Sequence, residues 1–354
     1  MSARLEVDLA ALKANYQTYQ NASRGGEVGA VVKADAYGLG AEAVATTLQA
    51  AGCCHFFVAT AAEGVALRKH VGAAAIYVFE GTQSVAELLS GGLIPVINHE
   101  SQLANWQPQR DLPCAIHVDT GMSRLGFASD FRTQDLANFN VAVLMTHLAC
   151  ADTPEHPLNT TQIERFDIVV KKLRQQFPAV LTSIGSSAGY LSGAAWQGDI
   201  GRPGIGLYGG NPFVDRPSPV APVARFEGEV LQLRHLPVGC SVGYGASMVT
   251  ERPTVMAVVG FGYADGVPRS LSNCGVMSVH GHRCPVIGRV SMDLTNVDVT
   301  DCLAAGVDVQ PGDWVECFGA CVSLDEAAGL AGTISYEILN RISARVTREY
   351  LAAG

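Results

Sequence analysis

The sequence predicts an α/β fold in two parts, an N-terminal (β/α)₈ barrel of the TIM type over residues 1–222 and a mostly β C-terminal part over residues 223–354. Short apolar runs without strict alternation recur between amphipathic segments in the first part, which is typical of parallel strands buried on both faces. In the second part, short strand-like runs are instead separated by turn sequences such as Asp265-Gly266.

Eight apolar runs are the expected barrel strands, and the segments between them are long enough to hold helices. The expected strands are residues 29–32, 56–59, 75–79, 94–97, 115–118, 141–145, 181–184 and 204–207. The expected helices include residues 41–51, 61–70, 84–89, 100–106 and 162–176. A doubly wound open sheet is the alternative that this alternation leaves open.

A proline-rich segment separates the two parts. Residues 211–222 read NPFVDRPSPVAP, and because proline disfavours regular elements we expect a linker there. Short strands follow, and a final helix is expected over residues 335–344. The first few residues of the chain are free to pack on the C-terminal part.

Composition excludes several classes of protein. The 354 residues are 48% hydrophobic and 16% charged, which excludes a disordered chain, and the net charge of −9 without a basic run argues against a nucleic-acid partner. No apolar stretch reaches the length of a membrane span, and the N-terminus lacks the apolar core of a signal peptide, so we expect a cytoplasmic protein with no membrane partner. The ten cysteines lack metal-ligand spacing, so we expect free, buried thiols and no metal site.

One lysine stands where barrel enzymes carry their active-site residues. Lys33 ends the first expected strand, and the C-terminal ends of barrel strands form the catalytic face. Desolvation there favours the neutral amine that a Schiff-base lysine needs. A lysine that only reaches out to solvent from the strand end would fit the position equally well.

The stretch AVVKADAYGLG around Lys33 closely resembles the lysine motif that binds pyridoxal phosphate (PLP) in bacterial alanine racemases. Seven further stretches resemble motifs of this family and follow in the family order: DTGMSRLG at 119–126, THLA at 146–149, GRPGIGLYG at 201–209, VGYG at 242–245, GYADG at 262–266, GRVSMD at 288–293 and ISYE at 334–337. The resemblance implies a homodimeric, PLP-dependent isomerase that interconverts L-alanine and D-alanine and supplies D-alanine for peptidoglycan precursors.

The resemblance also implies a role for each matched residue. Lys33 and Tyr244 would be the two catalytic bases, one on each face of the α-carbon, with Tyr244 and Met292 acting in the partner's site. Arg124 and the main chain of Met292 would bind the substrate carboxylate. The implied cofactor-binding residues, besides Lys33, are Tyr37, His147, Ser187, Arg202, Gly204, Ile205 and Tyr336, and the implied access channel for substrate contains Asp152, Tyr263 and Arg289.

Two positions depart from the family pattern. His117 stands where many members have a lysine, often carbamylated, whose negative charge positions the arginine that corresponds to Arg124. We therefore expect a bound small anion beside His117 and Arg124, unless Arg124 is held differently. Ser186-Ser187 replaces the usual Asn-Ser.

Three other functions are compatible with parts of this pattern. A serine or broad-specificity racemase would share the same fold and motifs. A non-catalytic PLP-binding barrel would lack residues 226–354 with Tyr244, and a decarboxylase of the same fold type would be expected to carry a glycine-rich phosphate stretch and a C-terminal catalytic cysteine.

Overall fold

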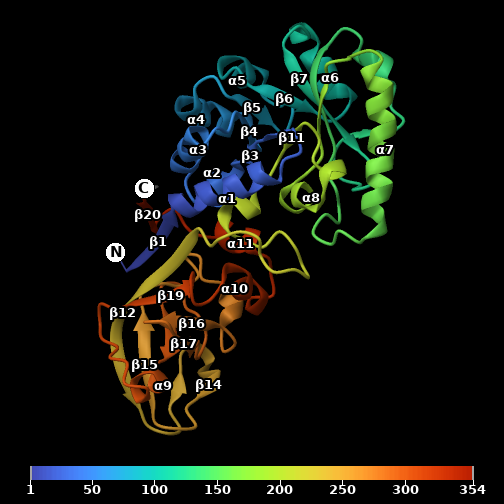
Figure 1. Ribbon diagram of the computed structural model, residues 1–354. Coiled ribbons are helices and arrows are strands. Elements are labelled where there is room, and N and C mark those ends of the chain that lie inside the picture. Colours follow the sequence, from blue (N-terminus) through green and yellow to red (C-terminus); the bar gives the residue numbers. More distant parts are fainter. Residues whose placement is uncertain (1, 353–354) are drawn as a thin grey trace.

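The computed structural model describes residues 2–352, and it has two lobes, with the barrel above the C-terminal lobe in the view of Figure 1. The barrel lobe contains one parallel sheet in the order β10-β9-β7-β6-β5-β4-β3. These strands are β3 (Ala30–Val31), β4 (His55–Val58), β5 (Ala75–Val78), β6 (Ile94–Ile97), β7 (Pro113–Asp119), β9 (Asn140–Met145) and β10 (Leu181–Ser183), with the short β8 (Phe127–Ala128) beside β7.

A further strand pair brings the two ends of this sheet together. β11 (Ile200–Gly201) runs parallel to β2 (Glu27–Val28), which continues into β3 after Gly29. Main-chain hydrogen bonds join Gly29 N to the oxygen of Gly201, and Arg202 N to the oxygen of Gly185 beyond β10. The strands thus form eight successive parallel positions, which confirms the predicted α/β barrel fold class rather than an open sheet.

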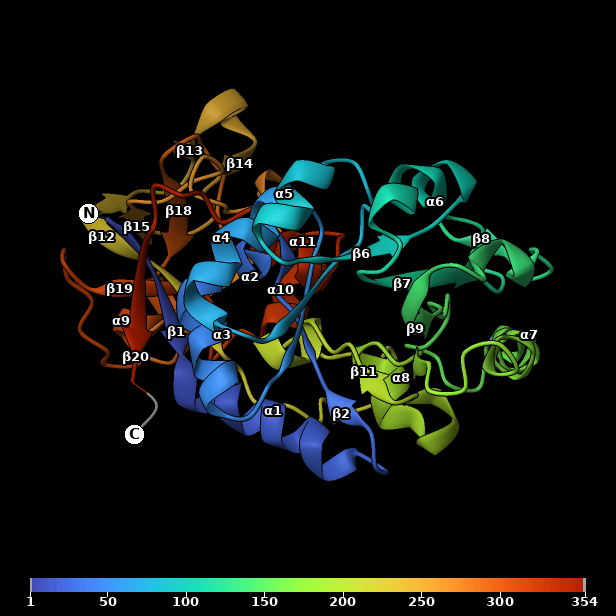
Figure 2. The same cartoon turned by 90° about the horizontal axis from the view of Figure 1, so that it is seen from above.

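Helices cover the outside of the strands, as the view from above shows (Figure 2). They are α1 (Leu9–Ala22), α3 (Ala41–Ala50), α4 (Ala61–Val71), α5 (Val85–Ser90), α6 (Glu100–Trp106), α7 (Pro157–Arg174) and α8 (Ser187–Ser192). Each predicted helix is present within a few residues of its expected bounds, although α7 begins earlier than predicted because Pro157 occupies its first turn. Helix α1 was not among the predicted elements.

The predicted eighth strand, residues 204–207, is wrong. The eighth strand is β11, and the segment after it is a 3₁₀ helix, η4 (Ile205–Tyr208). The main-chain N–H groups of Gly204 and Gly206 both donate to the hydroxyl of Ser187, at 2.9 and 3.2 Å, so this segment bonds to a side chain rather than to a neighbouring strand.

The C-terminal lobe is mostly β, as predicted. Its main sheet has the order β17-β16-β19-β12-β1-β20, with β15 joined to β12 and β18 joined to β15. The strands are β12 (Ala224–Leu236), β15 (Thr254–Val259), β16 (Val276–Val279), β17 (His282–Pro285), β18 (Thr295–Asp298), β19 (Trp314–Phe318) and β20 (Thr347–Leu351). The N-terminal strand β1 (Ala3–Asp8) lies between β12 and β20, so the first residues of the chain do pack on this lobe.

Smaller elements complete the lobe. They are the hairpin β13 (Ser241–Val242) and β14 (Met248–Val249), and the helices α9 (Thr300–Ala304), α10 (Leu324–Leu330) and α11 (Ser335–Asn340). The final helix ends four residues earlier than predicted, because Ser343 N donates instead to the oxygen of Asp265 at 3.0 Å.

All ten cysteines are free, and five of them are buried, so burial was predicted correctly for half of the thiols. Among residues 2–352, no helix combines the length and the apolar character that crossing a bilayer requires.

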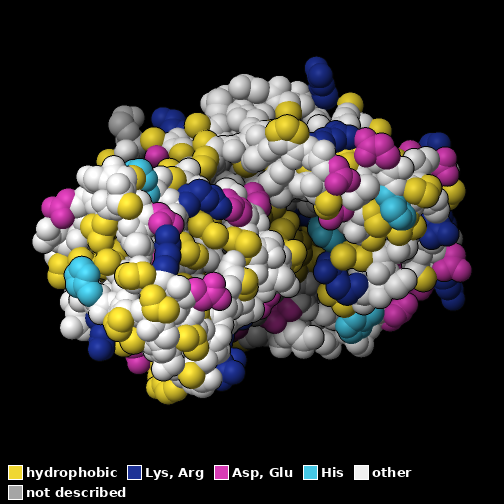
Figure 3. All heavy atoms as spheres, turned by 90° about the horizontal axis from the view of Figure 1, so that it is seen from below, with side chains coloured by type: hydrophobic (Ala, Val, Ile, Leu, Met, Phe, Trp, Pro, Cys, Tyr) yellow, Lys and Arg dark blue, Asp and Glu magenta, His cyan; other side chains and the backbone are white. Residues whose placement is uncertain are grey.

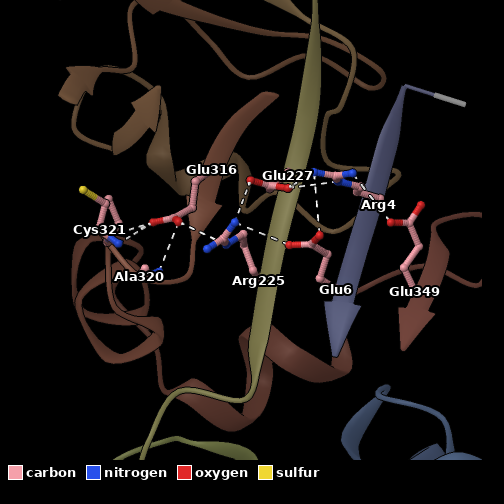
Figure 4. Close-up of polar contacts among 9 residues, drawn as sticks. Arg4, Glu6, Arg225, Glu227, Glu316, Ala320, Cys321 and Glu349 are labelled. Carbon is pink, nitrogen blue, oxygen red and sulfur yellow. Dashed lines mark hydrogen bonds and ion pairs between the residues drawn. The ribbon is translucent and has the colours of Figure 1, made fainter. Parts of the chain in front are cut away.

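A row of charged side chains connects β20, β1, β12 and β19 across the main C-terminal sheet (Figure 4). Arg4 pairs with Glu227 at 2.8 Å, and Arg225 contacts Glu316 at 3.6 Å. The carboxylate of Glu316 is nearly buried and accepts hydrogen bonds from the main-chain N–H groups of residues 320, 321 and 322, at 3.1, 2.7 and 2.9 Å. This one side chain therefore closes the loop that follows β19.

Replacing this carboxylate by an amide is expected to destabilise the protein. In Glu316→Gln the amide NH₂ faces at least one main-chain N–H, so at least one partly buried donor loses its acceptor and the free energy of unfolding falls by about 1 kcal/mol or more. Glu349→Gln is the matched control, because the Glu349 side chain is about half exposed and its one ion pair among the described residues is with Arg4, at 3.6 Å. Urea unfolding of both variants measures the difference, and equal stability of the two would contradict this account.

Candidate active site

A cavity of about 700 Å³ lies at the C-terminal ends of the barrel strands. Its lining comes from the ends of β3, β7 and β9, from the loops after β10 and β11, and from the start of α11 in the C-terminal lobe. Seen from below, the molecule is hollowed between its two lobes, and basic and histidine side chains lie beside the hollow (Figure 3). The lining includes Lys33, Tyr37, His117, Arg124, His147, Ser187, Arg202, Gly204, Ile205 and Tyr336.

The charge of this lining is one-sided. Three cationic side chains and two histidines face the cavity, and no Asp or Glu is among its lining residues. The lining also includes apolar side chains such as Phe79 and Met145. Such a cavity suits a ligand that carries anionic groups. Residues 2–352 contain no group of three or more His, Cys, Asp or Glu placed to hold a metal ion.

Arg202 is the most deeply buried of these cations. Its guanidinium donates to the hydroxyl of Ser183 and to the main-chain oxygens of Thr146 and Ile184, all neutral acceptors. No carboxylate among the described residues lies within ion-pair distance of it, and burial lowers the pKa of Arg202 to about 10. The guanidinium therefore remains protonated near neutral pH.

Lys33 lies where a free amine is favoured. Burial lowers the pKa of Lys33, the positive charge of Arg124 lowers it further, and only Glu63 acts in the opposite direction. The amine lies 6.0 Å from the centre of the Phe79 ring. A lysine in these surroundings can act as a nucleophile or a base near neutral pH.

The backbone directly after Lys33 is strained. Ala34, Asp35, Ala36 and Tyr37 have φ angles of 52°, 54°, 52° and 57°, so the short helix α2 (Lys33–Tyr37) contains a left-handed turn of L-residues. Such a conformation costs roughly 1–2 kcal/mol per residue. The carboxylate of Glu63 accepts from Ala34 N at 2.9 Å, and that of Asp35 accepts from Ala41 N at 2.7 Å, which helps to hold the turn. The turn directs both Lys33 and Tyr37 into the cavity.

A glycine at the start of this turn should relieve part of the strain. Ala34 is exposed, so Ala34→Gly removes only the clash of a Cβ with the left-handed backbone, and we expect the free energy of unfolding to rise by up to about 1 kcal/mol. The same substitution in the ordinary helix α3, Ala43→Gly, should lower it by about 1 kcal/mol. Thermal unfolding compares the two, and a loss of stability in Ala34→Gly would show that the turn is not strained.

The side of the cavity next to η4 forms a compact hydrogen-bonding group. Ser187 accepts from the main chain of Gly204, and a Cβ on Gly204 would come within 2.4 Å of the Tyr37 hydroxyl, so only glycine allows this approach. The Tyr37 ring packs against that of Tyr336, with centres 5.7 Å apart. Burial keeps both phenols protonated and raises the pKa of Tyr336 to about 12, so they can donate hydrogen bonds to an anion.

Both histidines of the cavity are neutral. Burial and the charges of Arg202 and Arg124 lower the pKa of His147 to about 3 and that of His117 to about 4. His117 lies on β7, and its Nδ1 is 3.0 Å from the side-chain oxygen of Asn98, which follows β6.

Comparison with known proteins agrees with this architecture. Residues 7–212 match the family described as "Alanine racemase, N-terminal domain", and residues 223–350 match "Alanine racemase, C-terminal domain". The chain belongs to the alanine racemase family.

Relatives of known name share the full length of the chain. A protein named "Alanine racemase, biosynthetic" from Agrobacterium fabrum is 42% identical, with 99% of this chain and 94% of that protein covered. "Alanine racemase, catabolic" of the same organism is 40% identical, with 100% and 93% covered. The crystal structure of alanine racemase from Bartonella henselae, with covalently bound pyridoxal phosphate, superposes with a TM-score of 0.91 at 35% identity and covers 99% of this chain and 100% of that one.

The site residues predicted from the C-terminal lobe do not all reach the cavity of their own chain. Tyr336 lines it, but Tyr244, Tyr263, Arg289 and Met292 do not. Tyr244 is 71% exposed and Met292 is 54% exposed. Tyr244 lies in the 3₁₀ turn η5 (Tyr244–Ala246) between β13 and β14 of the C-terminal lobe. Asp152, from the barrel lobe, does not line the cavity either, although its charge helps to raise the pKa of Tyr336.

Three residues that support the site were not predicted. Glu63 accepts from Ala34 at the strained turn, Asn98 contacts His117, and Phe79 lies beside the Lys33 amine. Only Glu63 had a visible signal, because Thr60-Ala61-Ala62-Glu63 has the spacing of a helix capping box.

Proposed function

We propose that the protein is a PLP-dependent alanine racemase that interconverts L-alanine and D-alanine with two bases, Lys33 and Tyr244. The observation that carries the proposal is the cavity itself. It is lined by a lysine with a lowered pKa and by a buried arginine that has no carboxylate partner among the described residues. Membership of the alanine racemase family and the similarity to the Bartonella henselae enzyme support the same function.

The residues present fit this cofactor. Its phosphate would be held beside Ser187 by the main chain of Gly204 and Ile205 and by the phenols of Tyr37 and Tyr336, where the glycine cradle and the absence of lining carboxylates favour an anion. Arg202 would face the pyridine nitrogen and His147 would lie near the ring. Because the Arg202 guanidinium keeps its own protons, it donates a hydrogen bond and does not protonate that nitrogen.

Racemisation needs a proton-transfer group on each face of one carbon. When bound, the cofactor withdraws electrons from the α-carbon of the amino acid and makes its proton acidic. Lys33 removes or returns that proton on one face, and Tyr244 does the same on the other. Arg124, with its planar set of donors, binds the substrate carboxylate. This contact fixes the orientation of the α-carbon, so that one of its faces lies toward Lys33 and the other toward Tyr244.

The second base comes from another copy of the chain. Tyr244 is exposed and lies outside the cavity of its own chain. It can therefore act only in a dimer, at the site that contains Lys33 of the other chain. Met292, exposed on the same lobe, offers its main-chain N–H to the substrate carboxylate in the same way. We therefore propose a homodimer with two shared sites.

The remaining expectations belong to the same proposal. In the dimer, the substrate access channel is formed by Asp152, Tyr263 and Arg289. The chain has two functional parts, a PLP-binding barrel over residues 1–222 and a C-terminal part over residues 223–354. The protein acts in the cytoplasm and supplies D-alanine for peptidoglycan precursors. The anion expected beside His117 and Arg124 is untested, and a direct contact between these two side chains is the alternative to it. No carboxylate among the described residues forms an ion pair with Arg124.

A substrate panel tests the proposed function. Purified protein supplied with PLP is incubated with each of several L-amino acids, alanine and serine among them, and formation of the D-enantiomer is followed. We expect alanine to be racemised with the highest kcat/KM, in both directions. Faster turnover of serine, or comparable turnover of many amino acids, would assign a different racemase, and no turnover at all would refute the proposal.

A further inference from the structure

Beneath the cavity, two buried amides are fixed in one orientation by the main chain. The side-chain oxygen of Gln102 accepts from Asn98 N at 2.9 Å, and its nitrogen donates to the oxygen of Glu80 at 2.6 Å. A main-chain N–H can only donate and a main-chain carbonyl can only accept. These two contacts therefore identify the oxygen and the nitrogen of the Gln102 amide.

Gln102 and the main chain in turn orient Asn98. The side-chain nitrogen of Asn98 is 3.1 Å from the oxygen of Phe79, 2.7 Å from that of Val96 and 3.1 Å from the side-chain oxygen of Gln102. All three neighbours are acceptors, so this atom must be the NH₂ group. The other end of the amide, which faces His117, is therefore the oxygen.

This orientation determines the tautomer of His117. The Asn98 oxygen can only accept, so the Nδ1 atom of His117, 3.0 Å away, must carry a proton. His117 is neutral near pH 7, because burial and the charges of Arg202 and Arg124 outweigh the nearby Asp119 and hold its pKa at about 4. A neutral imidazole with a proton on Nδ1 has none on Nε2, so Nε2 keeps a lone pair.

Arg124 is the most available donor for this lone pair. His117 and Arg124 both line the cavity, and the guanidinium of Arg124 makes no hydrogen bond among the described residues, so all five of its N–H groups are uncommitted. The other nearby guanidinium, that of Arg202, already commits three of its five N–H groups to oxygens. The third cation, the Lys33 amine, is reserved for the cofactor in the proposed function.

We propose that Asn98 and Gln102 lock His117 in the Nδ1–H tautomer, and that Nε2 of His117 accepts a hydrogen bond from Arg124 and thereby positions this guanidinium for the substrate carboxylate. The role toward substrate rests on the proposed function, whereas the tautomer and the contact do not. His117 and Asn98 are positioning residues, since they act through Arg124.

This arrangement differs from an anion held between the two side chains. An anion needs donors around it, and the Nε2 atom of neutral His117 has no proton to donate. A neutral acceptor also leaves the charge of Arg124 uncancelled, so the full charge remains for the substrate carboxylate.

Nitrogen NMR of protein labelled with ¹⁵N-histidine tests the tautomer and the contact. His117→Gln removes one of the nine histidines and so assigns the signals. At pH 7 we expect Nδ1 protonated and Nε2 unprotonated, and we expect Arg124→Leu to shift the Nε2 signal while Nδ1 stays protonated. Observation of the Nε2–H tautomer, or an Nε2 chemical shift that is unchanged in Arg124→Leu, would overturn the proposal.

Kinetics of two matched variants tests the consequence for substrate binding. His117→Gln keeps a side-chain acceptor within reach of Arg124, and His117→Leu removes it. We expect His117→Leu to raise KM for alanine about tenfold or more, while the change in kcat is smaller and His117→Gln stays near the wild type. Equal KM values in the two variants would overturn the positioning role.

Crystals of the PLP-loaded protein grown in bromide separate this arrangement from the anion. We expect no anomalous peak between His117 and Arg124, and a peak that contacts both would overturn the proposal. The NMR and bromide measurements do not depend on turnover. A protein that fails to racemise any amino acid would therefore refute the proposed function and still show whether the contact exists.

Discussion

Lys33→Ala is expected to lower racemase activity about a thousandfold or more, the largest effect of any single substitution considered for this chain. The amine has two proposed tasks, covalent attachment of the cofactor and proton transfer on one face of the α-carbon, and alanine performs neither. The pKa of Lys33 is lowered by burial and by Arg124, so the wild-type amine gives up its proton more readily than an ordinary lysine does. The measurement is kcat/KM in both directions, together with the visible absorption of the bound cofactor, which the variant should lose.

The control for this prediction is a lysine away from the cavity. Lys69 lies exposed near the end of α4, so Lys69→Ala should keep both the activity and the absorption. Reduction with borohydride fixes the cofactor to the lysine that holds it, and the modified peptide identifies that residue. Cofactor trapped on another lysine in Lys33→Ala would contradict the assignment.

The barrel strands were predictable because a strand that is buried on both faces appears in the sequence as a short, uninterrupted apolar run. In β4, for example, Phe56, Phe57 and Val58 are all buried, and no polar residue interrupts them. The segment 204–207 has the same apolar character but forms a 3₁₀ helix, because the Ser187 hydroxyl bonds the main chain of Gly204 and Gly206. An apolar run reports burial, and only the tertiary partners decide between strand and turn.

The strained turn after Lys33 could not be predicted from local preference. Ala34, Asp35, Ala36 and Tyr37 include no glycine, yet all four adopt positive φ angles that such residues rarely take. The turn is held by Glu63, which is distant in sequence, so its cause is tertiary. The same is true of the Asn98 contact with His117, since neighbouring strand ends meet only after the sheet has formed.

A residue of the cavity could be predicted from its place in the sequence, whereas the exposed site residues of the C-terminal lobe could not. Lys33 could be singled out from its position at a strand end. Tyr244 and Met292 have no such local signal, because each is an exposed side chain with no partner in its own cavity. Their roles were suggested only by the resemblance to alanine racemases, and they require a second copy of the chain.

Shared sites have a consequence that a mixing experiment measures. Tyr244→Phe removes the hydroxyl and keeps the ring, and the side chain is largely exposed, so the variant should fold and bind PLP. Alone it should lose racemisation in both directions, because each direction needs a proton donor on the face opposite the base. Proton exchange at the α-carbon of the enantiomer that faces Lys33 should persist in part.

Mixing Lys33→Ala with Tyr244→Phe protein, after dissociation and reassembly, should restore activity. In a mixed dimer one site receives both substitutions, whereas the other combines an intact Lys33 with an intact Tyr244 from the partner. Random pairing of equal amounts makes half of the dimers mixed, so about a quarter of all sites should be active. The matched control mixes Lys33→Ala with the double variant Lys33→Ala/Tyr244→Phe, in which no intact site can form. If activity does not return although subunit exchange is demonstrated, each site must lie within a single chain, and the shared-site arrangement is wrong.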